Sequence, residues 1–258
     1  YFFAHSPAGS GLFCSDGTAA GTRYLARMSA LDAPEPVKTS AGNRTFFIGI
    51  DESHGSELWV TDGNPEGTRR LRDLTPGPAS TQFGALKAAG PLLYFACTTP
   101  GFGTELWRSD GTETGTFLLR DIAPGETSSR PANIHFHLGH CFFSAWDPEH
   151  GRELWSTDGT PAGTALVEDV QPGESWAQPI GLATMGDRLV YFESADTLAQ
   201  SRLRLLPSAA VVAVVSNAQQ GRVTGAGRFG LGVRVPLTAL PEPGFMFSHW
   251  EGGGVGDP

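Results

Sequence analysis

A pattern of the form Glu-Leu-Trp-x-x-Asp-Gly recurs along this 258-residue chain and constrains its fold more than any other feature. Three strong copies begin at Glu57, Glu105 and Glu153, and each continues into a Gly-Thr pair. A weaker first copy has Gly11 in place of Glu and Phe13 in place of Trp. Successive copies are 46, 48 and 48 residues apart at the Trp position. This period predicts an array of one supersecondary unit, whose members bury their apolar faces against one another.

The third copy is the template for one unit. Apolar runs over 83–88, 92–96, 105–109 and 117–122, here strands a to d, are separated by turn-forming or polar residues. No helical period appears, and four short antiparallel strands in ~48 residues is the size of a propeller blade. Strand b is apolar on successive positions, so both of its faces must be covered. We therefore predict an all-β fold, a propeller-like array of four-stranded units with four to five blades. The array either closes into a ring or is an arc of a larger propeller.

Each position of the motif has a structural explanation. The Asp side chain can accept hydrogen bonds from backbone N–H groups two residues on, and the following Gly tolerates a positive φ. Gly115 is expected to provide a second positive-φ position before strand d. Leu106 and Trp107 point to opposite faces of strand c, so each packs on a different neighbour. The motif residues that we predict to be structural are Glu57, Trp59, Asp62, Gly63, Glu105, Trp107, Asp110, Gly111, Glu153, Trp155, Asp158 and Gly159.

The acidic residues of the three strong units leave one alternative open. They occupy the same three phases, which favours hydrogen bonding to turns and neighbouring blades that every unit needs. Three carboxylates are also hard oxygen ligands of the kind that Ca²⁺ prefers, although their spacing matches no known calcium loop. We expect no cofactor, with a structural Ca²⁺ in each unit as the alternative. The acids are Glu57, Asp62 and Asp73; Glu105, Asp110 and Asp121; and Glu153, Asp158 and Asp169.

Composition limits the partners. There are 27 acidic and 18 basic residues, a net charge of −9, and no basic cluster. Nucleic acid and anionic membranes need concentrated Lys and Arg, so neither is expected to bind. No run approaches the roughly 20 apolar residues of a membrane-spanning helix. Cys14, Cys97 and Cys141 form no CxxC pair, and we interpret them as buried or free thiols rather than a disulfide or metal site.

The motif over residues 1–206 resembles the ELWxxDGT-repeat family of large secreted or surface proteins of bacteria. The resemblance implies an extracellular or cell-surface location, a propeller-like array and a non-catalytic role. The first copy departs from the family pattern at Gly11 and Phe13. A fifth unit, from Gln178 to Leu206, has strand b at 189–192 but no Trp or Asp-Gly-Thr turn, so we interpret it as a degenerate terminal blade. The first unit is expected to lack strand a and the fifth to lack strand d.

The character of the chain changes at residue 207, where we place a boundary between domains 1–206 and 207–258. Strands are expected at 209–216, 233–239 and 244–252. The segment resembles the divergent internalin-type B-repeat, with its Leu-Thr-Ala-x-Pro run, Gly-Phe-x-Phe strand and Trp-x-Gly ending. The resemblance implies a small β-rich adhesion or spacer module. Such modules finish with one more strand, so this one is expected to be incomplete, with an unpaired edge.

A catalytic site should break the repeat symmetry, because one site serves the whole array. His135 and His137 share a strand face near His140 and Cys141, and an HxH pair can bind Zn²⁺. No third ligand has a fixed place beside them, so polar strand-edge histidines are the interpretation we favour. The loop between strands b and c varies between units, for example at 51–52 and 146–147. Variable loops on a repeated frame are where binding usually resides.

These observations favour a non-catalytic extracellular segment that binds a protein or glycan, or displays another domain, through its b–c loops and end faces. A purely structural stalk is one alternative. Another is a sialidase-like glycoside hydrolase, because Asp-Gly-Thr turns are similar to the Asp-box hairpins of sialidases. Such an enzyme needs clustered arginines, a Tyr nucleophile and an acid pair, which the sequence does not bring together. No GxSxG, P-loop or HExxH motif occurs, and we expect no enzyme activity.

Overall fold

The structure is a computed structural model. It describes residues 1–6, 9–29, 38–170, 179–193, 202–206, 208–211, 221–224, 227–230 and 238–241. These residues contain strands and turns but no helix, so the all-β prediction is confirmed. None of them forms a helix that is long and apolar enough to cross a membrane.

The first eighteen strands form five antiparallel sheets, here called blades 1 to 5 in chain order. Blade 1 contains β1 (Phe2–Ser6), β2 (Gly9–Cys14) and β3 (Arg23–Arg27). Blade 2 contains β4 (Lys38–Ala41), β5 (Arg44–Asp51), β6 (Gly55–Thr61) and β7 (Arg69–Arg70). Blade 3 contains β8 (Gln82–Ala89), β9 (Leu92–Thr99), β10 (Gly103–Ser109) and β11 (Phe117–Leu118). Blade 4 contains β12 (Ala132–His137), β13 (His140–Asp147), β14 (Gly151–Thr157) and β15 (Ala165–Glu168). Blade 5 contains β16 (Pro179–Met185), β17 (Arg188–Glu193) and β18 (Arg202–Leu206).

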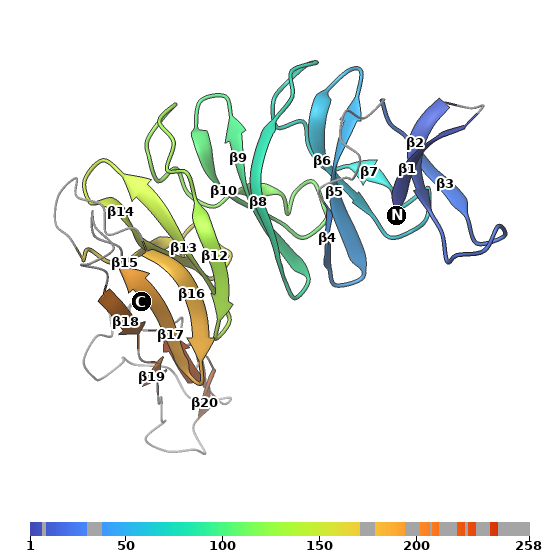
Figure 1. Cartoon of the computed structure of the whole chain (residues 1–258). Coiled ribbons are helices and arrows are strands. Elements are labelled where there is room, and N and C mark those ends of the chain that lie inside the picture. The colour runs from blue at the N-terminus through green and yellow to red at the C-terminus, as the bar shows by residue number, and fades with distance from the viewer. Residues whose placement is uncertain are drawn as a thin grey trace.

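The blades follow one another along an open arc, with blade 1 and blade 5 at its two ends (Figure 1). Within each blade, strands that are neighbours in the sequence pair with each other. Among the described residues, blades 2 to 4 have four strands and the two end blades have three, as the sequence predicts. Among the described strands, none from blade 5 joins the sheet of blade 1, so this structure shows the arc and not the closed ring.

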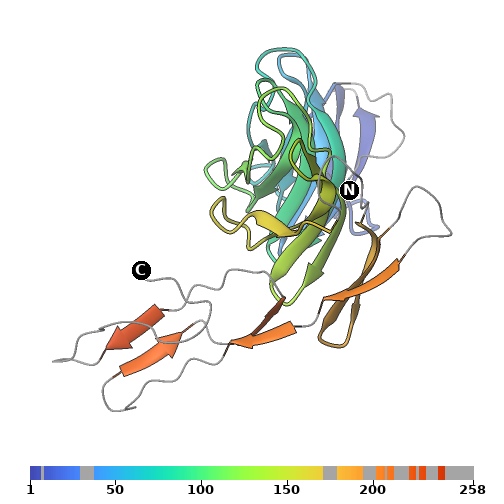
Figure 2. The same ribbon diagram turned by 90° about the vertical axis from the view of Figure 1, so that its left-hand side faces the viewer.

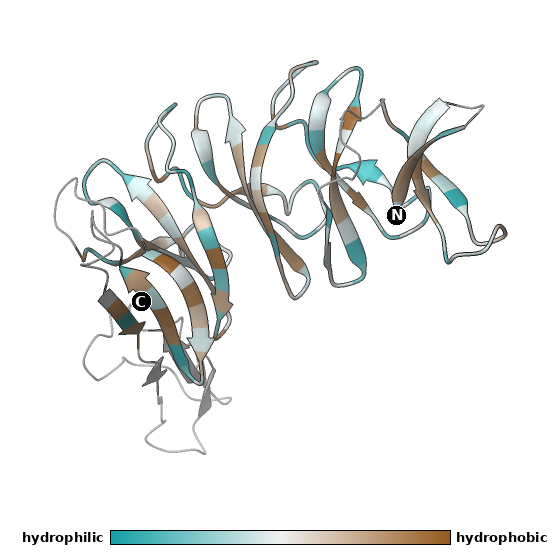
Figure 3. Cartoon of the chain, viewed as in Figure 1, coloured by the Kyte–Doolittle hydropathy of each residue, from teal (hydrophilic) through white to brown (hydrophobic). Residues whose placement is uncertain are grey.

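Apolar cores fill the spaces between successive blades, and the loops that join the strands are more polar (Figure 3). Trp107 and Phe95 of blade 3 pack with buried side chains of blade 2. Leu106, the neighbour of Trp107, packs instead with Phe143 and Trp155 of blade 4. The prediction that Leu106 and Trp107 contact different neighbours is therefore confirmed. Two further clusters join blade 1 to blade 2 and blade 4 to blade 5.

Strand d is shorter than predicted. In blade 3 it pairs only over Phe117–Leu118, although the sequence predicts a strand to Ile122. The Leu119 N–H still donates to the Leu106 carbonyl at 3.0 Å. Beyond that bond the chain leaves the sheet, because Leu119 and Ile122 enter the core shared with blade 4.

Four further strands follow blade 5: β19 (Ser208–Val211), β20 (Gly221–Thr224), β21 (Gly227–Gly230) and β22 (Thr238–Pro241). They form two antiparallel pairs, β19 with β21 and β20 with β22. These pairs lie beyond blade 5, to one side of the array (Figure 2). The strand predicted at 244–252 and the expected unpaired edge lie outside the described residues.

Candidate functional site

The Asp-Gly-Thr hairpin between strands c and d is the most regular feature of the array. In blade 3, Oδ1 of Asp110 accepts hydrogen bonds from the backbone N–H of Thr112 at 2.9 Å and from its hydroxyl at 2.6 Å. These bonds hold the pKa of Asp110 below its ordinary value of 3.8. The Thr112 hydroxyl then accepts from the N–H of Gly115 at 2.9 Å, which closes the loop. The same backbone bond recurs in the other hairpins, where Asp16 accepts from the N–H of Thr18 at 2.9 Å, Asp62 from that of Asn64 at 2.9 Å and Asp158 from that of Thr160 at 2.8 Å.

The two glycines of this hairpin are required for different reasons. Gly111 has a φ of 86°, as predicted. Gly115 is not among the positive-φ residues, so the expectation of a second left-handed position is wrong. A Cβ at Gly115 would instead lie 2.1 Å from Oδ1 of Asp110. The same clash, at 2.0–2.1 Å, arises at Gly21, Gly67 and Gly163. The second glycine therefore leaves room for the carboxylate that holds the turn.

Each interior hairpin is also held by the preceding blade. Arg69 of blade 2 donates to the Gly111 carbonyl of blade 3 at 2.7 Å, and Arg108 of blade 3 donates to the Gly159 carbonyl of blade 4 at 3.0 Å. Two more arginines donate to the carbonyl that ends the hairpin, from Arg72 to Thr116 at 3.1 Å and from Arg120 to Thr164 at 2.9 Å. Arg120 also lies over the Trp155 ring, 5.5 Å from its centroid, where a cation–π contact is favourable. Arginine side chains thus link blades that already share an apolar core.

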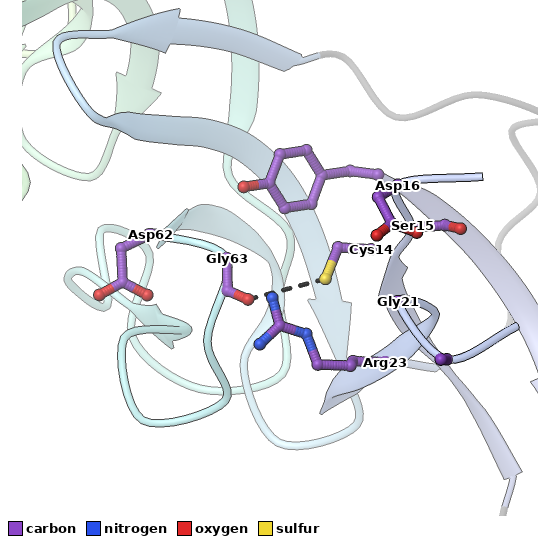
Figure 4. Close-up of a pocket in the computed structure, with 9 residues that line it drawn as sticks. Cys14, Ser15, Asp16, Gly21, Arg23, Asp62 and Gly63 are labelled. Atoms are coloured by element: carbon purple, nitrogen blue, oxygen red, sulfur yellow. Dashed lines mark hydrogen bonds between the residues drawn. The ribbon is translucent and has the colours of Figure 1, made fainter. Parts of the chain in front are cut away.

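A cavity of about 590 Å³ lies where the hairpins of blades 1 and 2 meet (Figure 4). Here the donor to the glycine carbonyl is a thiol, with Sγ of Cys14 3.6 Å from the Gly63 oxygen. The same position of strand c in blade 3 holds Arg108, whose longer side chain reaches the next hairpin. The volume lies in the range of small-molecule pockets. The residues that line the cavity are Tyr1, Cys14, Ser15, Asp16, Ala20, Gly21, Arg23, Asp62 and Gly63.

The polar groups of this cavity are already engaged. Asp16 and Asp62 each accept hydrogen bonds within their own turns. Nη1 of Arg23 lies 3.4 Å from Oδ1 of Asn64 in the facing hairpin. The cavity therefore results from a smaller tether at the first interface, and its charged groups serve the hairpins around it.

The motif glutamate is buried in each of blades 2 to 4, since Glu57, Glu105 and Glu153 all have 0 % exposure. Oε1 of Glu105 accepts from the N–H groups of Ala123 at 3.2 Å and Ser129 at 3.1 Å, and its Oε2 accepts from the Ser129 hydroxyl at 2.5 Å. The carboxyl thus joins strand c to the connection that leads into the next blade. Burial raises its pKa to about 7. Glu57 holds the corresponding residues of blade 2, with Oε1 3.1 Å from the Thr75 nitrogen and 2.7 Å from the Thr81 hydroxyl.

The three acids of blade 3 form hydrogen bonds in three separate places. In blade 3, Glu105 bonds to the connection after strand d, Asp110 bonds within the hairpin, and Asp121 accepts from the Gly125 N–H at 3.2 Å. Within the described part of the chain, no group of three or more His, Cys, Asp or Glu side chains is placed to hold a metal ion. In blade 3 the three acids thus make three separate structural bonds.

The histidines of blade 4 contact blade 5. His135 Nε2 lies 2.9 Å and His137 Nδ1 3.3 Å from the Thr184 hydroxyl of β16. The two rings share a face, as the alternation predicts. His137 is 4 % exposed, so it is a buried contact rather than the strand-edge residue that we expected. His140 is also buried, and its Nδ1 lies 3.3 Å from the Leu138 carbonyl in the same hairpin.

Two of the b–c loops share a turn that the sequence analysis missed. In blade 2, Oδ1 of Asp51 lies 2.8 Å from the backbone nitrogen and 2.8 Å from the ring Nδ1 of His54. In blade 4, Oδ1 of Asp147 lies 2.8 Å from the nitrogen and 2.9 Å from Nδ1 of His150. The hydrogen bond to Asp147 raises the pKa of His150. The shared Asp-x-x-His-Gly spacing could have revealed this turn, because both loops end in the same glycine.

The remaining side chains singled out in the sequence lie in the cores. Cys97 and Cys141 are buried free thiols between blades, and Cys14 is a half-buried free thiol. The Trp position of blade 5 is occupied by Arg204, which lies opposite Tyr191 in the register. Nη2 of Arg204 lies 3.3 Å from Oε1 of Glu168 in blade 4. An ion pair thus replaces the Trp contact at this interface.

Comparison with known proteins identifies the C-terminal module. Residues 211–257 match the family described as the Divergent InlB B-repeat domain, which confirms the predicted B-repeat. Such domains are typical of bacterial surface proteins. No curated protein matches the chain.

Solved structures match the chain only distantly. A puromycin hydrolase has 14 % identity and a TM-score of 0.42 over 72 % of this chain and 28 % of that one. A prolyl endopeptidase has 13 % identity and a TM-score of 0.42 over 86 % of this chain and 34 % of that one. The computationally designed Ika8 protein has 14 % identity and a TM-score of 0.36 over 92 % of this chain and 70 % of that one. The chain thus spans about a third or less of the two hydrolases. The chain therefore contains a series of three- and four-stranded antiparallel β-sheets followed by a match to the Divergent InlB B-repeat domain over residues 211–257.

Proposed function

We propose that this chain is a non-catalytic binding or display segment of an extracellular bacterial protein, and that its blades are ELWxxDGT repeats. The observation that carries the proposal is the repeated structural use of the reactive side chains. Asp110 holds its own turn, Glu105 holds the connection to the next blade, and Arg108 holds the next hairpin. Equivalent bonds recur in other blades, whereas a catalytic group is needed only once. The B-repeat match supports a location at the cell surface.

The b–c loops are the binding edge that we propose. These loops lead into strand c, whereas the Asp-Gly-Thr hairpins follow it, so the two sets of loops lie at opposite ends of the blades. Glu52, Phe102 and Glu149 are exposed at the tips of these loops in blades 2, 3 and 4, and Phe102 is 40 % exposed. A solvent-facing aromatic ring between carboxylates offers stacking to a sugar ring or an apolar contact to a protein. The Asp–His turns of blades 2 and 4 would hold this edge in one conformation.

Glycan-array and protein-array binding by this segment tests the proposal. The variant Glu52→Ala/Phe102→Ala/Glu149→Ala should lose the ligand. The control Glu66→Ala/Glu113→Ala, which removes two exposed carboxylates from the hairpin edge, should keep it. Loss in the control alone would place the site on the hairpins. Failure of the unmodified segment to bind either array would favour the display stalk.

The hydrolase alternative is less well supported. Tyr94 and Tyr191 are 4 % and 1 % exposed within cores between blades, and burial raises the pKa of Tyr94 to about 12. A Tyr nucleophile needs access to substrate and a base that can take its proton. Hydrolysis of a chromogenic sialoside by the purified segment would contradict the non-catalytic proposal.

A further inference from the structure

Every interior interface of the array joins two different kinds of face. At the first three interfaces, the later blade presents a Phe of strand b beside the Trp of strand c, and this pair packs on the preceding blade. At the fourth, Tyr191 and Arg204 of blade 5 hold these two positions, and Tyr191 packs on blade 4. We call that side the leading face and the opposite side, which packs on the following blade, the trailing face. The cross-strand pairs are Phe47 with Trp59, Phe95 with Trp107 and Phe143 with Trp155.

None of the described blades packs on the leading face of blade 1. Phe2 lies opposite Phe13, at the positions of the interior Phe–Trp pairs, with ring centroids 5.7 Å apart. Phe13 also contacts Tyr24 of β3, with ring centroids 5.3 Å apart. Phe2 and Tyr24 are each 40 % exposed. The three rings form an aromatic row across the sheet, which is open to solvent.

The trailing face of blade 5 is the matching open surface. Ile180, Phe192 and Leu203 lie opposite one another across its three strands. They are 40 %, 47 % and 53 % exposed, and Leu205 beside them is 41 % exposed. The other side of the same sheet is buried against blade 4. Exposed apolar surfaces of this kind mark interaction sites.

We propose that two copies of this chain associate head to tail, with the leading face of blade 1 in one copy packed on the trailing face of blade 5 in the next. The contact would continue the series of four interior interfaces, which all join a trailing face to a leading face in this order. The two open faces lie at opposite ends of the arc, so one copy does not cover its own (Figure 1). Because the two faces differ, the contact is heterologous and can close a ring or extend a filament.

Complementation between two single-face variants tests the proposal. Phe2→Glu places a carboxylate on the leading face and Leu203→Glu places one on the trailing face. Both positions are exposed, so each variant should fold, which circular dichroism and the melting temperature check. In sedimentation equilibrium, the unmodified chain should show a mass that rises with concentration above that of one chain. Each variant alone should stay monomeric. An equimolar mixture should form a dimer and nothing larger, because it contains one intact face of each kind.

The pair Tyr24→Lys and Phe192→Lys repeats the test with the opposite charge, and should give the same result. An unmodified chain that stays monomeric at every concentration would overturn the proposal. Association of the Leu203→Glu variant by itself would show that two leading faces pair, or that another part of the chain mediates contact. Either result would also overturn it.

Discussion

The Asp110–Gly115 pair gives the most direct test of how the repeated hairpin is stabilised. Asp110→Ala removes two hydrogen bonds that the carboxylate accepts from the N–H and the hydroxyl of Thr112. A hydrogen bond to a charged group contributes roughly 1.5–3 kcal/mol, and Asp110 is partly exposed, so we expect a total loss of about 2 kcal/mol. Gly115→Ala adds a Cβ that would lie 2.1 Å from the same carboxylate. The carboxylate must then move away, so this variant should lose about the same free energy.

The double variant distinguishes this explanation from a general preference for glycine. If Gly115 serves only to leave room for Asp110, then Asp110→Ala/Gly115→Ala should unfold with about the same free energy as either single variant. Urea unfolding followed by Trp fluorescence measures all four proteins. Glu113→Ala, an exposed change in the same loop, is the control and should stay within about 0.5 kcal/mol of the unmodified chain. Additive losses of about 4 kcal/mol would refute the reasoning, because the glycine would then be needed for its backbone.

The pH dependence supplies an independent check of the same bonds. The pKa of Asp110 is lowered in the folded chain, so its contribution is present above the unfolded value and is lost as the pH falls through the folded one. The difference between the unmodified chain and Asp110→Ala should therefore shrink in acid. A difference that stays constant down to strongly acidic pH would show that the ionised carboxylate is not what holds the turn.

The remaining predictions concern other positions of the array. Burial raises the pKa of Glu105 to about 7 from 4.5, so stability present below pH 4.5 should fall by about 3 kcal/mol as the pH rises through 7. Glu105→Gln should remove that dependence in urea unfolding at a series of pH values. Trp107→Ala should cost ~3–5 kcal/mol in the same assay, since the indole is 6 % exposed between two blades. Leu138→Asn should stabilise the chain by about 1 kcal/mol, because Leu138 has a φ of 47° and is exposed. A higher melting temperature would verify this. Cys14→Arg should strengthen the tether to the Gly63 carbonyl by about 1 kcal/mol and slow hydrogen exchange in blade 1.

The sequence predicts the parts of the fold that are local or repeated. The period and the strand pattern predict the blades, and Asp110 and Gly111 predict the hairpin, because these bonds join residues close together in the chain. The ends of the strands are less predictable. Strand d stops at Leu118 because Leu119 is needed in the core with blade 4, which only the packed array determines.

The contacts of the candidate site are also hard to predict, because they join residues that are far apart in the sequence. The bonds to the glycine carbonyls join residues far apart in the chain, 42 residues for Arg69 with Gly111 and 51 for Arg108 with Gly159, and these two donors lie on different strands of their blades. The sequence does not show why residue 115 is a glycine, because glycine is required both where φ is positive and where a Cβ would clash with a neighbouring side chain. The burial of His137 was not predicted, because alternation along the strand determines which face the side chain lies on but not that blade 5 covers this face.

The hydrogen bonds between blades explain why the Asp-Gly turn is repeated in the sequence while the side chains that donate to it differ. At the first three interfaces the glycine carbonyl of the Asp-Gly turn accepts a hydrogen bond from a side chain of the preceding blade. Cys14, Arg69 and Arg108 each donate to it at one interface, from two different strands. The shape of the turn must therefore stay constant while its partners can change. It follows that the motif marks what every blade needs to pack on its neighbours, whereas differences in function between such arrays should lie in the loops and end faces that the motif leaves open.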